Sequence, residues 1–114
     1  MKELEKLYKE LDKGDVMKTR AYELTIIFHP NLEDSMDKEL EKVKKIIEKY
    51  GGKITKAELD GKKRLAYAIR GEEFGIYYYF DLEMPEDVVM RVNRELNIWD
   101  DVMRFLLVPA RENR

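Results

Sequence analysis

The feature of this sequence that most constrains its fold is a repeated change in hydrophobic period. Within residues 20–29 every second residue is a large apolar one, and the same alternation returns within residues 76–84. Alternation of this kind predicts strands that bury one face. Within residues 36–50 and residues 85–96, apolar residues recur every three or four positions, which predicts helices with one buried stripe. The chain therefore combines strands and helices that each bury one side.

Two further strands are expected, at residues 53–69 and residues 102–108. Asp60-Gly61 marks a bulge or a tight bend within the first of them, and a hairpin at that point is the alternative. After an N-terminal helix, the expected order is strand, helix, strand, strand, helix, strand. This order predicts a ferredoxin-like α+β fold, in which two helices cover one face of a four-stranded antiparallel sheet. Right-handed connections would place the first and third strands side by side at its centre.

A chain of 114 residues predicts one domain, here residues 20–110, with a helical extension at residues 1–19 and a short basic tail at residues 111–114. An isolated helix of the length of this extension is marginal in water. We therefore expect the extension to dock on its own domain. Its apolar residues recur at helical spacing and are Leu4, Leu7, Tyr8 and Leu11.

The residue types that the chain lacks narrow its chemistry. With no cysteine there is no disulfide, thiolate metal site or cysteine nucleophile, which suits a reducing cytoplasm. No apolar run approaches the roughly 20 residues that cross a bilayer, so a soluble protein is expected. Paired acid and base groups and metal-ligand spacings are also missing, so we expect neither an enzyme nor a cofactor. His29, the single histidine, precedes a proline and is interpreted as a turn residue, not as a metal ligand.

Positive charge and aromatic rings gather in two adjacent segments. Lys62, Lys63 and Arg64 are consecutive cations, and the aromatic run Ile76–Phe80 follows shortly after them. Cations attract phosphate and aromatic faces stack on bases, so this combination predicts an RNA-binding surface. The alternative is two ordinary strands of a half-buried sheet.

The charges are distributed unevenly, although the formal net charge is only −2. Residues 53–70 carry six cations and two anions, whereas residues 81–101 carry two cations and seven anions. A chain polarised in this way can meet phosphate on one side and a basic protein on the other. Accidental clustering on a charge-rich, solvated surface is the alternative.

The sheet face without helices is predicted to be unusually apolar for an exposed one. Exposed apolar patches tend to mark interaction sites. We therefore predict that a protein partner contacts this face. The residues that the expected alternation places there are Ile27, Tyr77, Tyr79, Arg104 and Leu106.

Several short motifs, taken in their order along the chain, point to one family. They are Arg20-Ala21-Tyr22-Glu23, Pro30-Asn31-Leu32, Tyr50-Gly51-Gly52, Arg64-Leu65-Ala66-Tyr67 with Ile69, and Glu83-Met84-Pro85. Together they resemble the bacterial small-subunit ribosomal protein S6 family over residues 20 to 109. Two features depart from the family pattern. One is the helix before Arg20, and the other is Trp99, which stands in a turn where basic residues are common.

The resemblance implies a structural, non-catalytic protein of the ribosome in the cytoplasm. It further implies binding to the central domain of small-subunit ribosomal RNA, as a heterodimer with the small basic ribosomal protein S18. A nearly neutral chain would need such a partner to contribute cations, and the acidic span at residues 81–101 would help to attract it. The residues expected to contact RNA are Arg20, Tyr22, Arg64, Tyr67 and Arg70.

Two other functions are compatible with the predicted topology. An RNA-recognition-motif domain binds single strands with aromatics on the helix-free face, but Phe74-Gly75-Ile76-Tyr77 matches its Gly-aromatic signature poorly. A ferredoxin-like small-molecule regulatory module would have a ligand pocket or form a symmetric dimer. Binding to short single strands without a partner would favour the first of these functions.

Overall fold

The computed structural model describes residues 19–110, so the predicted N-terminal helix and the basic tail lie outside the described residues. The predicted order of strands and helices is confirmed, with a short 3₁₀ helix before each α-helix. The elements are β1 (Thr19–Phe28), η1 (Pro30–Ser35), α2 (Met36–Lys49), β2 (Lys53–Ile69), β3 (Glu72–Pro85), η2 (Glu86–Val88), α3 (Val89–Ile98) and β4 (Val102–Pro109).

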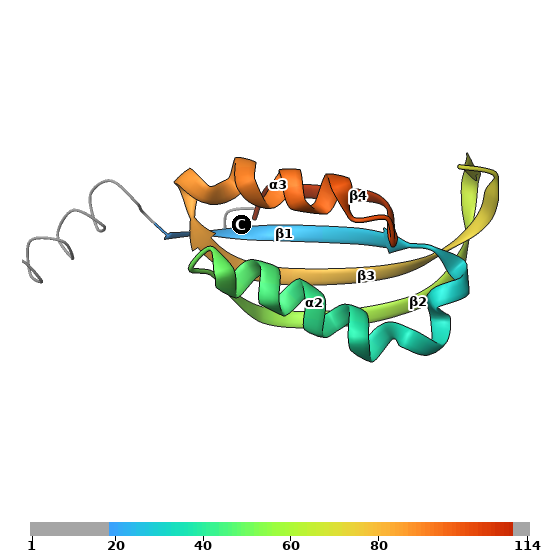
Figure 1. Cartoon of the computed structure of the whole chain (residues 1–114), viewed down its shortest axis with the longest axis horizontal. Helices are drawn as coiled ribbons and strands as arrows, with labels where there is room; N and C mark the ends of the chain where they lie inside the picture. The colour runs from blue at the N-terminus through green and yellow to red at the C-terminus, as the bar shows by residue number, and fades with distance from the viewer. Residues whose placement is uncertain (1–18, 111–114) are drawn as a thin grey trace, which may run out of the picture.

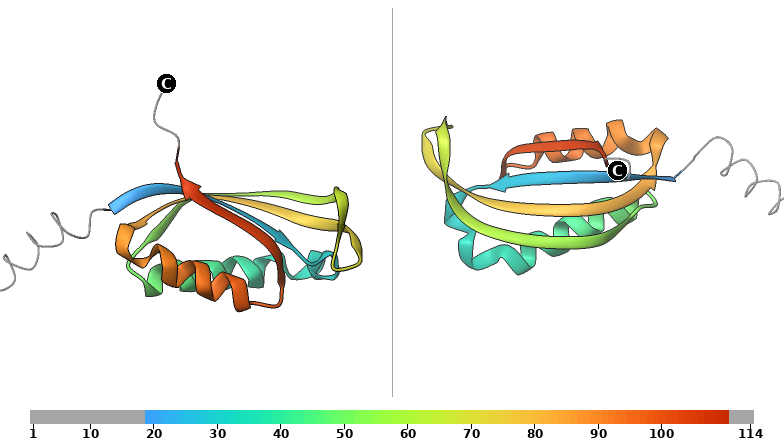
Figure 2. Two further views of the ribbon diagram at one scale, coloured as in Figure 1. Left: turned by 90° about the horizontal axis from the view of Figure 1, so that it is seen from above. Right: turned by 180° about the vertical axis from the view of Figure 1, so that it is seen from behind.

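The four strands form one antiparallel sheet in the order β2-β3-β1-β4. This order confirms that the first and third strands of the sequence lie side by side at its centre. Figure 2 shows that α2 and α3 lie against the same face and leave the other face open. The fold is therefore the expected ferredoxin-like arrangement.

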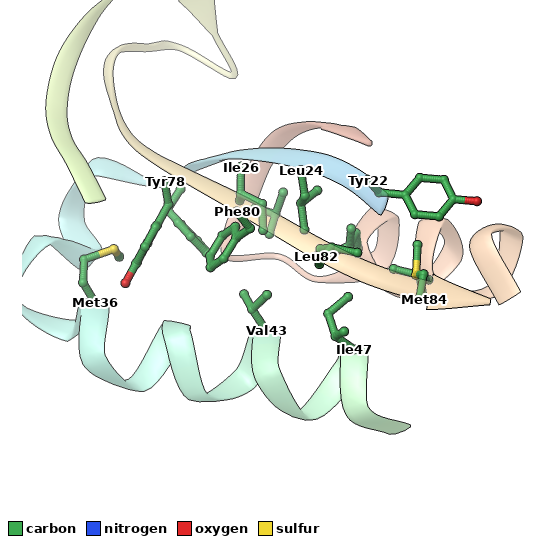
Figure 3. Close-up of a cluster of buried hydrophobic side chains, with 14 of the residues drawn as sticks. Tyr22, Leu24, Ile26, Met36, Val43, Ile47, Tyr78, Phe80, Leu82 and Met84 are labelled. Atoms are coloured by element: carbon green, nitrogen blue, oxygen red, sulfur yellow. The ribbon is translucent and has the colours of Figure 1, made fainter. Parts of the chain in front are cut away.

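The pairing of β1 with β3 is uninterrupted, from Thr19 opposite Pro85 to Phe28 opposite Ile76. Because the register never slips, alternate side chains of the two strands gather on the helical face. Figure 3 shows this cluster, in which the rings of Tyr78 and Phe80 stack with centroids 4.6 Å apart. Its buried members from the two strands are Tyr22, Leu24, Ile26, Phe28, Ile76, Tyr78, Phe80, Leu82 and Met84.

Each helix closes the core with an apolar stripe. Val43 and Ile47 of α2 and Val92 and Leu96 of α3 are all fully buried. Burying side chains of this size stabilises the fold by roughly 1.5–3 kcal/mol each. The end of α2 lies so close to β3 that a Cβ atom added at Gly52 would lie 2.6 Å from the Glu83 carbonyl oxygen.

The β2–β3 hairpin extends beyond the end of β1, because β1 pairs with β3 only as far as Ile76. The predicted bulge in β2 is confirmed, since the register shifts between Leu59 and Gly61, and the alternative of a hairpin there is wrong. The chain instead reverses at Arg70 and Gly71, whose φ angles of 52° and 80° are those of a two-residue type I′ turn. Figure 1 shows the tip of this hairpin curling past the end of β1.

One buried carboxyl group lies where α2 meets the turn before β4. The Glu39 side chain is 3% exposed, and its Oε1 atom has no hydrogen-bond partner among the described residues. Its Oε2 atom lies 3.5 Å from Lys42 Nζ, which in turn lies 3.3 Å from Asp101 Oδ2. Burial raises the pKa of Glu39, a hydrogen bond with Asp101 raises it further, and Lys42 acts in the opposite direction.

We predict that Glu39→Gln makes the protein more stable at neutral pH. Because the folded-state pKa of Glu39 lies above the ordinary value of 4.5, the free energy of unfolding falls as the pH rises from 4.5 through the folded-state pKa and then levels off. Glutamine keeps the shape and removes the titration, which should stabilise the fold by on the order of 1 kcal/mol at neutral pH. Urea unfolding at a series of pH values measures this change.

Glu41→Gln is the matched control for that measurement, because Glu41 lies on the exposed side of the same helix. The control variant should show the pH dependence of the wild type. A Glu39→Gln variant whose stability still falls with pH as steeply as that of the wild type would contradict the role given to this carboxyl group.

Candidate nucleic-acid interface

The outer part of the β2–β3 hairpin presents cations beside an exposed aromatic ring. Arg64 lies opposite Phe74 in the strand register. The Arg64 Cζ atom lies 5.7 Å from the centroid of the Phe74 ring, and Lys62 Nζ lies 5.6 Å from it. Phe74 is 38% exposed, so the ring is open to a ligand. We call the exposed residues Lys62, Lys63, Arg64, Tyr67, Arg70 and Phe74 the hairpin surface.

Lys63 joins the hairpin surface to the open face of the sheet. Its Nζ atom lies 5.6 Å from the centroid of the Tyr77 ring, a ring that belongs to the helix-free face. Lys63 also forms an ion pair with Asp60. The hydrogen bond that Lys63 donates to Asp60 within this pair raises the pKa of Lys63. Lys63 therefore remains charged at neutral pH.

Tyr67 ties the tip of the hairpin to β4. Arg104 Nη1 donates a hydrogen bond of 2.6 Å to the Tyr67 hydroxyl, and the Arg104 Cζ atom lies 5.6 Å from the centroid of the Tyr67 ring. Arg104 itself lies opposite Ile27 in the register of the sheet. One side chain thus links the predicted RNA residues to the predicted partner residues.

Ion pairs within the hairpin are weak enough to exchange for phosphate. Arg64 Nη2 lies 3.3 Å from Glu73 Oε1, but both side chains are largely exposed. Exposed pairs of this kind contribute only about 0–1 kcal/mol. Within residues 19–110, Lys62 and Arg70 form no ion pair at all. The hairpin surface can therefore bind an anionic chain with its cations and stack bases on its rings.

The predicted RNA residues do not all lie together. The structure brings Arg64, Tyr67 and Arg70 onto the hairpin, whereas Arg20 lies at the other end of β1, about 30 Å along the strand. There, Arg20 Nε lies 3.4 Å from Glu86 Oε2. Tyr22 is only 5% exposed, and Figure 3 shows its ring at one end of the core cluster with the hydroxyl turned away from the other side chains. The contact of Tyr22 with RNA stays a prediction, and the burial of its ring leaves the hydroxyl as the group that would make it.

The predicted partner residues form one continuous patch on the open face. Tyr77, Ile27 and Arg104 lie in one row across three strands, and Tyr79, Thr25 and Leu106 lie in the next row. Tyr77 and Tyr79 lie with ring centroids 6.4 Å apart, and Leu106 is 60% exposed. The structure thus brings these five residues together, and their contact with a partner stays a prediction. We call Ile27, Tyr77, Tyr79, Arg104 and Leu106 the open-face patch.

Phe74 and Lys62 are candidate contact residues that the sequence pattern did not single out. Phe74 was read only as part of a poor motif, and Lys62 only as one of three cations. In the structure, Arg64 lies opposite Phe74 across the hairpin, and Lys62 Nζ lies 5.6 Å from the centroid of the same ring. Counting back along both strands from the turn at Arg70-Gly71 would place Tyr67 opposite Phe74. The register shift between Arg64 and Ile69 brings Arg64 there instead, and no signal in the sequence marks that shift.

Two further observations concern sites of other kinds. Within residues 19–110, no group of three or more His, Asp or Glu side chains is arranged to hold a metal ion. In the same part of the chain, neither α-helix has the length and apolar character needed to cross a membrane.

Comparison with known proteins gives one consistent result. The family model described as Ribosomal protein S6 matches residues 21–109. The small ribosomal subunit protein bS6 of Thermus thermophilus is 39% identical over 96 residues, which cover 82% of this chain and 93% of the relative. The protein of that name from Corynebacterium aurimucosum is 40% identical over 86 residues, covering 75% of this chain and 90% of the relative. The crystal structure of the 30S ribosomal protein S6 from Thermotoga maritima gives a TM-score of 0.75 at 28% identity, covering 82% of this chain and 89% of that chain.

We predict that Tyr67→Phe loosens the tip of the hairpin without unfolding the domain. The change removes the hydroxyl that accepts the hydrogen bond from Arg104 and keeps the ring beneath the guanidinium. Loss of about 1 kcal/mol should speed amide hydrogen exchange in residues 64–70 by about fivefold, while exchange in β1 stays the same. Tyr79→Phe is the control, because the Tyr79 hydroxyl has no hydrogen-bond partner among the described residues. Unchanged exchange in the Tyr67→Phe hairpin would contradict this role.

Proposed function

Since this chain belongs to the ribosomal protein S6 family, we propose that it binds the central domain of small-subunit ribosomal RNA together with ribosomal protein S18. The family consists of structural proteins of the small ribosomal subunit and is not a family of enzymes. The chain is accordingly a cytoplasmic protein that acts at the ribosome. The RNA contact and the heterodimer are the parts that we propose.

The observation that supports RNA binding most strongly is the hairpin surface. Apart from Lys62, which lies level with the end of β1, its cations and rings lie beyond that end, and all of them are exposed. Lys62 and Arg64 flank the Phe74 ring within 6 Å, so one nucleotide can stack on the ring while its phosphates meet the cations. Arg20 is a separate candidate contact at the other end of β1.

The need for a partner follows from the charge. A net charge of −2 gives the whole chain little attraction for RNA, and part of the hairpin charge is paired with Asp60 and Glu73. A small basic protein on the open-face patch would add the missing cations beside the hairpin.

Partner and RNA binding would be coupled through Arg104. A protein that covers the open-face patch touches Arg104, and Arg104 holds Tyr67 on the hairpin surface. Ordering Arg104 would therefore hold the hairpin in position for RNA. Coupling between two sites is typically about 1–3 kcal/mol, which is enough to make RNA binding depend on the partner.

The direct test is a titration of a central-domain RNA fragment with the full chain, first alone and then with S18. Tight binding only in the presence of S18 supports the proposal. Equal binding of short single strands without S18 would favour the RNA-recognition-motif function instead. No binding of either RNA in either format would contradict both.

We predict that Arg64→Ala weakens binding of the RNA fragment several-fold and flattens its salt dependence by about one ion, because one phosphate contact is lost. Titrations at a series of salt concentrations measure the slope. Arg91→Ala is the matched control, since it removes the same side chain from the exposed surface of α3, on the helical face. An Arg64→Ala slope equal to that of the control would show that Arg64 does not contact phosphate.

A further inference from the structure

A groove at the β4 edge of the molecule contains three of the most exposed apolar side chains among the described residues. It lies between α3 and the edge strand β4 and has a volume of about 540 Å³. Met90, Ile98 and Leu106 line it and are 75%, 74% and 60% exposed. Apolar surface of this kind marks a contact site. The groove lies outside both the hairpin surface and the RNA contacts proposed above, and it shares only Leu106 with the open-face patch.

The exposed side of α3 has the form of a helix-packing ridge. Met90, Arg94 and Ile98 follow one another at intervals of four residues, so they make one straight row along the helix. Rows at this spacing pack against the row of a second helix. Arg94, in the middle of the row, forms no ion pair within residues 19–110. The groove thus fits a helix with an apolar stripe and a neighbouring negative charge.

The chain before β1 leaves the domain at the beginning of this groove. Thr19 lies opposite Pro85, the residue before η2 and α3, and Arg20 is paired with Glu86. At the same corner, the backbone amide of Ala110, just after β4, donates a hydrogen bond to Ala21. Residues 14–18 can span at most about 17 Å. A segment at residues 1–13 is therefore close enough to turn back along α3.

The sequence of that segment complements the groove. On a helical projection of about 100° per residue, its apolar residues form one stripe. Glu3 and Glu10 border the stripe on one side, and Glu5 and Asp12 border it on the other. All four lysines of residues 1–13 lie on the opposite side. Acidic borders of this kind can pair with Arg94 while the stripe covers the apolar row.

We infer that residues 1–13 form a helix that lies antiparallel to α3 and covers this groove. Leu11 then lies near Met90, and Leu4 lies near Ile98. A helix of 13 residues is about 20 Å long and α3, with 10 residues, is about 15 Å long, so the segment covers the whole row. The short connection raises the effective concentration of the segment to the millimolar range, which favours it over a separate molecule. This segment precedes residues 21–109, the part that matches the family.

The test measures the exposure of the Met90 methyl group in the full-length chain without RNA. Methyl groups of the six methionines are isotope-labelled, Met90 is assigned with Met90→Leu, and a soluble gadolinium chelate is added to the NMR sample. The wild type should show a protected Met90 methyl group. Leu7→Gln with Leu11→Gln should raise its relaxation enhancement several-fold, because the apolar stripe is lost. Arg94→Glu should raise it less, through repulsion of the acidic borders.

Lys6→Gln with Lys13→Gln is the matched control, since it introduces the same residues on the opposite side of the projected helix. It should leave Met90 protected. The inference would be overturned if the relaxation enhancement of the Met90 methyl group were equally high in the wild type, in Leu7→Gln with Leu11→Gln and in Arg94→Glu. Protection that increases with protein concentration, together with a dimer mass in sedimentation equilibrium, would also overturn it, because a second copy would then cover the groove. Either result leaves the proposed RNA binding unaffected, since no RNA is present.

Discussion

The uninterrupted pairing of β1 with β3 is the constraint on which the rest of this structure depends. Ten consecutive pairs keep the register, so the buried apolar side chains of both strands all lie on the helical face. A slip of one residue would turn that set to the open face and bring Tyr77 and Tyr79 into the core. Both helices then pack on a surface that the two central strands have already defined.

The same pairing decides where the functional surfaces lie. Because β1 ends opposite Ile76, the longer hairpin continues alone and becomes an exposed, cationic projection. The hairpin bends beyond the end of β1 and brings Tyr67 to Arg104 of β4, so one hydrogen bond joins the hairpin surface to the open-face patch. The sites that we propose for RNA and for a protein partner therefore adjoin and share one side chain.

Periodicity predicted the faces of the strands well, because a pleated strand allows only two directions for a side chain. Tyr22 shows this, since it alternates with Leu24 and Ile26 and the structure buries it on the same face. Its contact with RNA stays a prediction. The contact between Tyr67 and Arg104 could not be predicted, since it depends on a register shift between Arg64 and Ile69 that bends the hairpin. The burial of Glu39 could not be predicted from the sequence either, because it results from how the turn at Asp101 packs on α2.

The measurement that tests the central claim most directly is amide hydrogen exchange of the full chain, free and in complex with S18 and the central-domain RNA fragment. The account predicts new protection in residues 62–74 and in the strands beneath the open-face patch, with little change in α2. Protection confined to α2 and α3, with an unchanged hairpin, would contradict it. In that case RNA and partner would bind the helical face, and the hairpin surface would be an ordinary solvated hairpin.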